Sequence, residues 1–223
     1  MTVADLLRRA RKKLDDVTGT STTKFWTDEQ LINDYGNKAM DDMCRKTRLL
    51  IIQTDDISIV AATPTYDLAE YILDVLRIKP ASRSPLIRCE VDELDRDCPG
   101  WEDYAAANPW GYIPDMNTQA ITFVPTPVAT ETATMKVGRL PATYMDYLIP
   151  AASPEIPTRY HANLIPGICA QALDDGDDDA IRPQMAAKFQ AEFDNRCEMI
   201  KRELYMQLSS GNVLNRIPSG LLP

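Results

Sequence analysis

The sequence predicts an α+β fold: a helical bundle formed by the N- and C-terminal helices, with an inserted small antiparallel β module and an extended C-terminal arm. Apolar residues recur at helical spacing near both ends of the chain, whereas short β-branched segments separated by prolines fill its middle. The last fifteen residues contain no acidic side chain. The predicted parts are N-terminal helices at 1–53, the β module at 54–140, C-terminal helices at 141–208 and the arm at 209–223.

The first helix is predicted over residues 3–17, with Thr2 placed to cap its first turn. Its apolar face comprises Val3, Leu6, Leu7, Ala10, Leu14 and Val17. The opposite face carries basic side chains: Arg8, Arg9, Arg11, Lys12 and Lys13. A charged face of this kind is most often solvated, and the alternative is a contact with an acidic neighbouring subunit or with DNA.

The second helix is predicted from residue 28 to about residue 48. Thr27 is a favourable N-cap, and Gln30 three residues later completes a capping box. Trp26 is placed to form a hydrophobic staple with the first residue of an apolar stripe. That stripe repeats every four residues: Leu31, Tyr35, Ala39 and Met43. Gly36 and Asn37 weaken the helix interior, so we expect tertiary packing to stabilise this helix.

The middle of the chain predicts a small antiparallel sandwich or barrel, because short alternating runs are separated by proline turns. We predict strands at 57–60, 75–79, 86–89, 120–124 and 134–138, and a short acidic helical turn at 90–97. A loop rich in proline and glycine carries four aromatic residues: Trp101, Tyr104, Trp110 and Tyr112. We expect this loop to fold onto the β module, and an aromatic ligand platform is the alternative.

Helices resume after an extended segment at 139–157 that is punctuated by prolines. One is predicted from Tyr160 to Leu173, and Pro166 within it predicts a kink or a late start. Another is predicted from Pro183, a residue favoured at the first helical position, to about residue 208. Its apolar stripe comprises Met185, Phe189, Phe193, Cys197, Ile200, Leu204 and Leu208.

Composition limits the classes of function. The net charge of −9 argues against a general nucleic-acid-binding protein, which is normally basic. It is compatible with a protein that surrounds DNA without gripping it, because an acidic lumen repels phosphates. The five cysteines match no zinc-binding spacing, and we expect reduced, mostly buried thiols. No apolar run approaches the roughly 20 residues of a membrane span, and the basic, amphipathic N-terminus does not resemble a signal peptide.

Residues with catalytic potential are few. His161 is the one histidine, and Cys169 lies about two helical turns further on, too far for direct contact. A capping or interface histidine is therefore favoured over a Cys–His pair. The acidic run at 174–179 fails the calcium-loop pattern, because Met185 stands where a bidentate glutamate is required, and a solvated turn is favoured.

An acidic stretch could supply a general acid–base pair, as in a glycosidase. It comprises Glu90, Asp92, Glu93, Asp95 and Asp97, and nothing in the sequence marks any two of them as buried. The nine glycines are scattered and form no phosphate-binding loop. We predict no catalytic residue, no cofactor and no metal ion.

The order of several short motifs resembles the head-to-tail adaptor (connector) proteins of short-tailed bacteriophages. A helix start at Phe25–Leu31 is followed by strands at Tyr66–Leu68 and Val75–Ile78. An acidic turn ending in Pro99-Gly100-Trp101 follows, then Phe123–Pro127 with its Pro-x-Pro turn, and lastly Ile156-Pro157 leading to His161. The chain departs from the family pattern at Leu68-Ala69, where Leu-Pro is usual.

The resemblance implies a structural virion protein at the head–tail junction, assembled in the host cytoplasm. Such adaptors form a ring, usually twelve-fold, beneath the portal protein. The ring holds DNA in its channel without reading its sequence and provides a platform for the tail tube or nozzle protein and tail fibres. The family's C-terminal segment commonly docks onto the portal, and residues 209–223 suit that role because they gain buried apolar area on binding. The residues assigned to this contact are Val213, Leu214, Arg216, Ile217, Leu221 and Leu222.

Two other classes of function are alternatives. A carboxylate-dependent cell-wall glycosidase would need two acidic residues whose replacement abolishes turnover, and a blank zymogram would dispose of it. A cytosolic adaptor unrelated to bacteriophages would be distinguished by gene context, because a neighbouring portal gene supports the virion protein instead.

Overall fold

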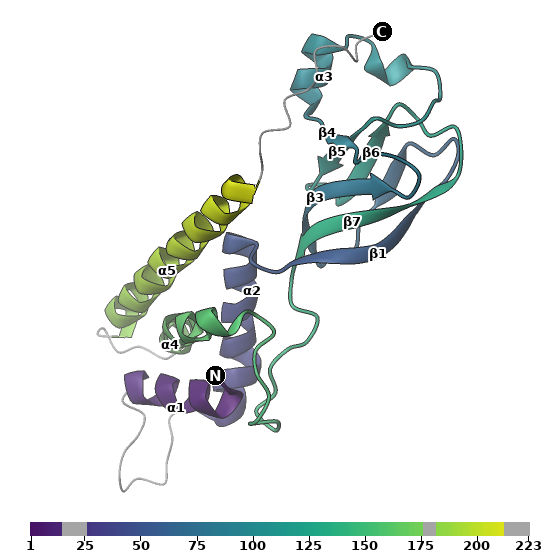
Figure 1. The fold of residues 1–223 in the computed structure, drawn as a ribbon. Coiled ribbons are helices and arrows are strands. Elements are labelled where there is room, and N and C mark those ends of the chain that lie inside the picture. Colours follow the sequence, from purple (N-terminus) through teal and green to yellow (C-terminus); the bar gives the residue numbers. More distant parts are fainter. Residues whose placement is uncertain (15–25, 176–181, 212–223) are drawn as a thin grey trace, which may run out of the picture. The chain divides into compact units, whose positions relative to one another are not determined.

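The computed structural model describes residues 1–14, 26–175 and 182–211, which combine helices with two β-sheets (Figure 1). The predicted mixture of helices and sheets is confirmed. These residues fall into two compact units. The described parts of Met1–Leu49 and Ala142–Pro223 form the helical unit, and Leu50–Pro141 forms the β unit.

The first helix, α1 (Val3–Leu14), begins where the sequence predicts. Thr2 and Asp5 cap it reciprocally: the Asp5 N–H donates to Thr2 Oγ1 at 3.3 Å, and the Thr2 N–H donates to the Asp5 carboxylate at 3.3 Å. Val3, Leu6 and Ala10 are buried, which confirms the apolar face at these positions. The end of the predicted helix, including Val17, lies outside the described residues.

The second helical segment contains a π-helical turn, η1 (Gln30–Asp34), which continues into α2 (Tyr35–Thr47). The predicted capping box is confirmed. The Gln30 N–H donates to Thr27 Oγ1 at 3.1 Å, and the Thr27 N–H donates to the Gln30 side-chain oxygen at 2.9 Å. The predicted apolar stripe is buried along its length: Leu31, Tyr35, Ala39 and Met43.

Two asparagines on this segment bind the irregular chain that precedes the later helices. Asn33 Oδ1 accepts a hydrogen bond from the Tyr147 N–H at 3.0 Å. Asn37 accepts from the Met145 N–H at 2.8 Å and donates to the Met145 carbonyl at 2.9 Å. A Cβ at Gly36 would lie 3.1 Å from Met145 Cε. Gly36 therefore leaves space for Met145, and Asn37 hydrogen-bonds to its backbone. These contacts agree with the expectation that tertiary packing stabilises this helix.

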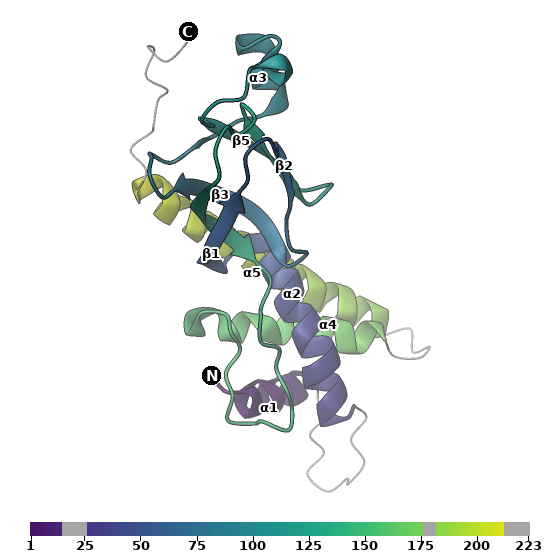
Figure 2. The same ribbon diagram turned by 90° about the vertical axis from the view of Figure 1, so that its right-hand side faces the viewer.

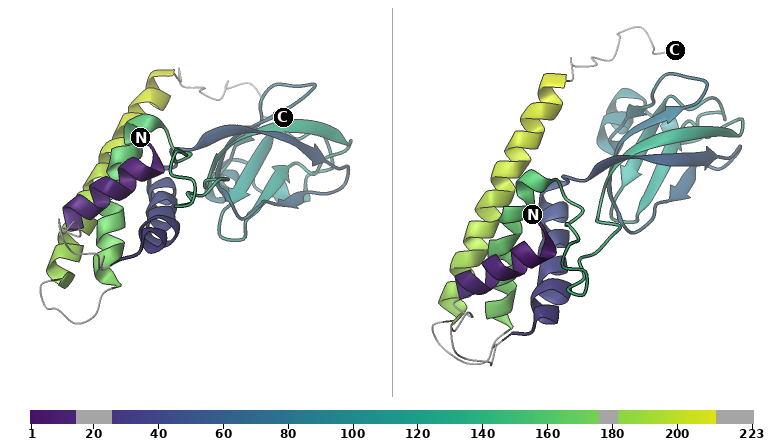
Figure 3. Two further views of the ribbon diagram at one scale, coloured as in Figure 1. Left: turned by 90° about the horizontal axis from the view of Figure 1, so that it is seen from below. Right: turned by 60° about the horizontal axis from the view of Figure 1, so that its bottom comes forward.

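A 3₁₀ turn, η3 (Thr158–Asn163), leads into α4 (Leu164–Asp174). Pro166 falls in the first turn of α4, where a missing N–H costs no intrahelical hydrogen bond, so the predicted late start is confirmed. Figure 3 shows α4 beside α5 (Arg182–Gly211), and α4 also contacts α1 and α2. Contact with three other helices buries α4 on most sides, including Leu164, Ile168 and Ala172.

The predicted apolar stripe of α5 is confirmed at Phe193, Cys197 and Ile200, which are buried. It is wrong at Met185, which is 40% exposed, because Ala186 is the buried residue in the first turns. Ala186 lies seven residues before Phe193 and therefore shares its face of the helix. The side chain of Leu208 is outside the described set.

The β unit contains two sheets (Figure 2). In the first, β7 (Glu131–Arg139) pairs antiparallel with β1 (Ile51–Ile59) on one side and β3 (Ile72–Pro80) on the other. The second has the order β2-β6-β5-β4. Its strands are β2 (Thr65–Asp67), β4 (Ile87–Arg88), β5 (Gly111–Asp115) and β6 (Ala120–Val124). Strands are confirmed at all the predicted positions, and β3 ends at Pro80 as expected.

One strand and one strand direction differ from the prediction. The sequence places Tyr112 in the aromatic loop, but it lies in a strand, β5 (Gly111–Asp115), and β5 runs parallel to β4 with Ile87 opposite Gly111. A crossover between the two strands contains the predicted acidic helix, α3 (Val91–Asp97), and it returns the chain in the same direction. A Cβ at Gly111 would lie 2.8 Å from Cys89 Sγ and 3.2 Å from the Ile87 carbonyl oxygen, so a larger residue would clash with the segment that contains β4.

Successive side chains of β5 and β6 point to opposite faces of the sheet, so these two strands contribute to two hydrophobic cores. Tyr112 and Phe123 belong to the larger core, which contains residues of both sheets. Their neighbours Ile113 and Val124 face the opposite side and pack with Leu94 of α3. Partly buried Trp101, in η2 (Trp101–Asp103), also packs there, so this part of the aromatic loop folds onto the β unit as expected.

Candidate functional site

The predicted basic face of α1 divides into one buried and four exposed side chains. Arg11 is 6% exposed, whereas Arg8, Arg9, Lys12 and Lys13 are exposed. The Arg11 guanidinium donates to the Trp26 carbonyl at 2.9 Å and forms an ion pair with Asp28. Arg11 therefore differs from the sequence prediction. It lies inside the helical unit, because the residues that start the second helix supply acceptors for it.

We expect Arg11→Gln to lower the free energy of unfolding by about 2 kcal/mol, because hydrogen bonds to charged groups contribute about 1.5–3 kcal/mol. Asp28 is partly exposed, so water can replace part of the lost interaction. The matched control is Arg9→Gln, a change of the same charge on the same helix, which should alter stability by less than about 0.5 kcal/mol. Urea unfolding followed by circular dichroism measures the stability of both variants. Equal losses of stability would contradict the conclusion that Arg11 is held inside the unit whereas Arg9 is not.

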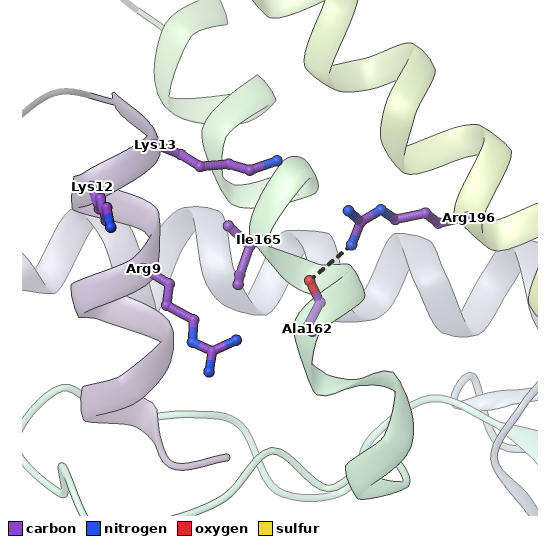
Figure 4. Close-up of a pocket in the computed structure, with 6 residues that line it drawn as sticks. All are labelled: Arg9, Lys12, Lys13, Ala162, Ile165 and Arg196. Carbon is purple, nitrogen blue, oxygen red and sulfur yellow. Dashed lines mark hydrogen bonds between the residues drawn. The ribbon is translucent and has the colours of Figure 1, made fainter.

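A groove of about 510 Å³ lies on the helical unit between α1, α4 and α5, and Figure 4 shows the residues that line it. Side chains from these elements and η3 line it: Arg9, Lys12, Lys13, Ala162, Ile165 and Arg196. Cationic groups form most of its rim, and Ile165 and Ala162 supply an apolar floor. The Arg196 guanidinium donates to the Ala162 carbonyl at 3.2 Å, which fixes one side of the groove.

The four cations of this basic groove are not equivalent. Lys13 Nζ lies 3.1 Å from each carboxylate oxygen of Glu192, and Arg196 donates to the same carboxylate at 2.6 Å. These cations lower the pKa of Glu192 against the opposing effect of its partial burial, which keeps the carboxylate ionised. Arg9 and Lys12 have no ion pair with any residue that the structure describes. Arg9 also interacts electrostatically with Asp5, one helical turn earlier. Of the described cations on this rim, these two are the ones that no ion pair with a described residue holds in place.

The chemistry of the basic groove is that of binding. Guanidinium and ammonium groups recognise carboxylates and phosphates, and the apolar floor accepts an aliphatic side chain. Sequence reasoning identified its three α1 cations but missed Arg196, Ala162 and Ile165. The spacing of Glu192 and Arg196 marks a salt bridge on a helix surface, but it does not indicate which other helix lies beside it.

Arg8 lies outside this groove. Its guanidinium is 3.0 Å from the Asp5 carboxylate, and it lines a separate depression of about 400 Å³ with Leu7 and Tyr147. The six C-terminal residues assigned by sequence to a partner contact lie beyond the described chain.

The one histidine makes structural hydrogen bonds. His161 is 1% exposed, and its two ring nitrogens lie 2.9 Å from the Met1 carbonyl and 2.8 Å from the Ile156 carbonyl. Burial raises the pKa of Cys169 to about 12, so this thiol is protonated and a poor nucleophile at neutral pH. Both groups support the structural interpretation of this segment over a Cys–His pair.

The remaining chemical candidates are also accounted for. The five carboxylates at 90–97 are exposed, and hydrogen bonds from the Arg96 guanidinium lower the pKa of Asp97, the opposite of what a general acid requires. Within the described ranges, no cluster of three His, Cys, Asp or Glu side chains is arranged to hold a metal ion. Four of the five cysteines are buried and none of the five forms a disulfide bond, which agrees with the prediction.

No helix in the described part of the chain is long and apolar enough to cross a membrane. Comparison with protein families finds that the family model described as SU10 adaptor protein matches residues 1–214. This range includes all the helices and strands described above. No curated protein matches the chain.

Proposed function

The chain belongs to the SU10 adaptor protein family, and from this membership we propose that it is a structural virion protein forming a ring beneath the portal of a bacteriophage. The ring connects the capsid to the tail and surrounds the DNA channel. The observation that carries this proposal is the family match over nearly the whole chain. The order of short motifs along the chain, which resembles phage adaptors, agrees with it.

The proposed partners follow from this position in the virion. The ring contacts the portal protein above and a tail tube or nozzle protein below, and tail fibres attach to the same platform. We propose twelve copies, the number usual in adaptors of this kind. DNA passes through the channel without sequence-specific contacts, and the net charge of −9 favours its free passage. The protein assembles in the host cytoplasm and resides at the head–tail junction.

Within each subunit, we propose that the N- and C-terminal helices form a bundle that serves as the frame of the ring. The contacts of α4 with α1, α2 and α5 support this role, because a central helix shared by three neighbours makes a rigid frame. The β module, predicted at 54–140 and containing all of β1 from Ile51, is inserted into this frame. Residues 209–223 extend from it as the arm, although α5 continues to Gly211 and the described chain ends there.

We propose that the arm docks onto the portal through six residues: Val213, Leu214, Arg216, Ile217, Leu221 and Leu222. Its composition supports this assignment, because covering exposed apolar side chains with a partner surface is energetically favourable. The arm also carries one arginine and no acidic residue, so an acidic portal surface would be complementary.

We expect Leu221→Ser combined with Leu222→Ser to weaken binding to the portal about 100-fold. Each buried leucine contributes about 1.5 kcal/mol, and 1.4 kcal/mol corresponds to a factor of ten in affinity. A chain ending at Gly211 should bind more weakly still and keep its thermal stability, because α5 remains intact. Co-sedimentation with purified portal rings measures binding.

The matched control is Asn215→Ser combined with Ser219→Ala, which changes two polar arm residues and should leave portal binding unchanged. Docking by the arm is wrong if the chain ending at Gly211 binds the portal like the full-length protein. The wider proposal of an adaptor is wrong if the full-length chain neither binds the portal nor forms a ring on it, as seen by electron microscopy.

A further inference from the structure

We propose that the basic groove of one copy binds the acidic helix α3 of the next copy, forming the contact between neighbouring subunits. This inference rests on the proposed ring and identifies residues on both sides of its repeated interface. The side chains involved are Arg9 and Lys12 on the groove and Val91, Asp92 and Asp95 on α3.

The groove has two properties that select its occupant. Arg9 and Lys12 are exposed cations that form no ion pair with a described residue, although Arg9 interacts electrostatically with Asp5 one helical turn earlier, whereas Lys13 and Arg196 are held by Glu192. Between them, Ile165 and Ala162 line an apolar floor. An occupant that satisfies both properties presents two carboxylates beside an aliphatic side chain.

The exposed face of α3 has this composition. Val91 is 45% exposed, although it is an aliphatic residue on a short surface helix. Asp95 is four residues later, on the same side of the helix, and exposed Asp92 is adjacent. The Trp101 indole N–H donates to Asp95 at 2.9 Å, which fixes this carboxylate at the surface. Val91 thus suits the floor of the groove, and Asp92 and Asp95 suit its cations.

A protein partner fits the groove better than DNA. DNA-binding faces carry many cations that contact successive phosphates, and the two groove cations that form no ion pair with a described residue are few for that purpose. Phosphates would also leave the apolar floor uncovered.

The two complementary surfaces occupy different parts of one chain, so pairing them between copies produces a heterologous contact. Contacts of this type close into rings when the rotation between copies permits. The same pair of surfaces would then recur at every interface of the ring. Because the attraction is between charged groups near the surface, salt should weaken it.

The test uses charge reversal on each surface, with assembly on purified portal rings measured by electron microscopy and native mass spectrometry. The groove variant carries Arg9→Glu and Lys12→Glu, and the helix variant carries Asp92→Lys and Asp95→Lys. Each alone places like charges opposite each other, and we expect ~10-fold or greater loss of complete rings. An equimolar mixture of the two variants should restore rings, because each reversed groove then meets a reversed helix.

Matched controls reverse two charges elsewhere on the same unit. Lys38→Glu with Arg202→Glu matches the groove variant, and Asp67→Lys with Glu70→Lys matches the helix variant, since all four residues are exposed. Both controls should assemble like the wild type. Circular dichroism establishes that every variant is folded, and binding of a 30-base-pair DNA duplex is measured in parallel.

The outcomes separate this inference from the proposed function. If the wild type forms no ring on the portal, the adaptor proposal itself fails. If the wild type forms rings and the two variants do so equally well, the contact between groove and α3 is wrong while the adaptor proposal stands. Loss of rings that the mixture does not restore also overturns it. Normal rings with weaker duplex binding by the groove variant would assign the groove to DNA.

Discussion

Replacing Trp26 with alanine is expected to lower the free energy of unfolding of the helical unit by about 3–5 kcal/mol, the range for truncating a large buried aromatic side chain. Trp26 is 7% exposed, and its indole N–H donates to the Ala172 carbonyl at 3.0 Å. That carbonyl belongs to the last turn of α4, where carbonyls have no intrahelical donor. Trp26 thus joins the start of one helical segment to the end of another.

Two variants make the effect of Trp26→Ala interpretable when unfolding in urea is followed by circular dichroism. Trp26→Phe keeps most of the apolar volume but leaves the Ala172 carbonyl without this donor, and it should cost about 1–3 kcal/mol. Trp110→Ala removes an indole that is 38% exposed in the β unit and should cost less than Trp26→Ala. A loss below about 1 kcal/mol for Trp26→Ala would mean that this side chain does not link the helices.

Phe193→Ala is expected to have an effect of similar size, about 3–5 kcal/mol, because it removes a buried ring where three helices meet. Phe193 is 1% exposed. A Cβ placed on Gly167 would lie 2.9 Å from Phe193 Cε2 and 2.9 Å from Ala39 Cβ. The ring of α5 and the residue of α2 therefore both reach the backbone of α4 at this glycine. Phe193→Leu, which refills most of the space, should cost less than half as much.

A double-mutant cycle tests the contact between Phe193 and Gly167 directly. Gly167→Ala alone should destabilise the protein by about 1–3 kcal/mol, because its methyl group overlaps the ring. In the Phe193→Ala background the same change should cost less, since the ring is gone, although the overlap with Ala39 remains. Strictly additive effects would show that the glycine is needed for a reason other than this ring.

These two sites concern assembly as well as stability. Trp26 and Phe193 determine how α2, α4 and α5 pack, and the basic groove lies between α1, α4 and α5. A subunit whose helices pack loosely would present Arg9 and Arg196 in variable positions. If the basic groove makes the proposed contact between copies, ring formation on the portal should therefore fall in Trp26→Ala and Phe193→Ala even at temperatures where both variants remain mostly folded.

Local sequence patterns were sufficient to predict those features that depend on residues close together in the chain. The capping box of Thr27 and Gln30 predicted a helix start, and Pro166 predicted the late start of α4. Period-two runs predicted β3, β6, β7 and the end of β1, which supply most of the larger core. By contrast, β5 was missed because Gly111 and Pro114 interrupt its pattern, and its pairing with β4 depends on a crossover that no local signal describes.

The sequence alone determined the α+β class and the order of motifs that relates the chain to phage adaptors, because capping, periodicity and turn chemistry act between residues a few positions apart. Only the tertiary structure decided which basic residues of α1 are available. Arg11 and Arg9 are two positions apart in one charged run, yet Arg11 is held by Trp26 and Asp28 and Arg9 lines the groove. That difference depends on acceptors contributed by another helix, and a helical pattern specifies the face of a side chain but not what lies opposite it.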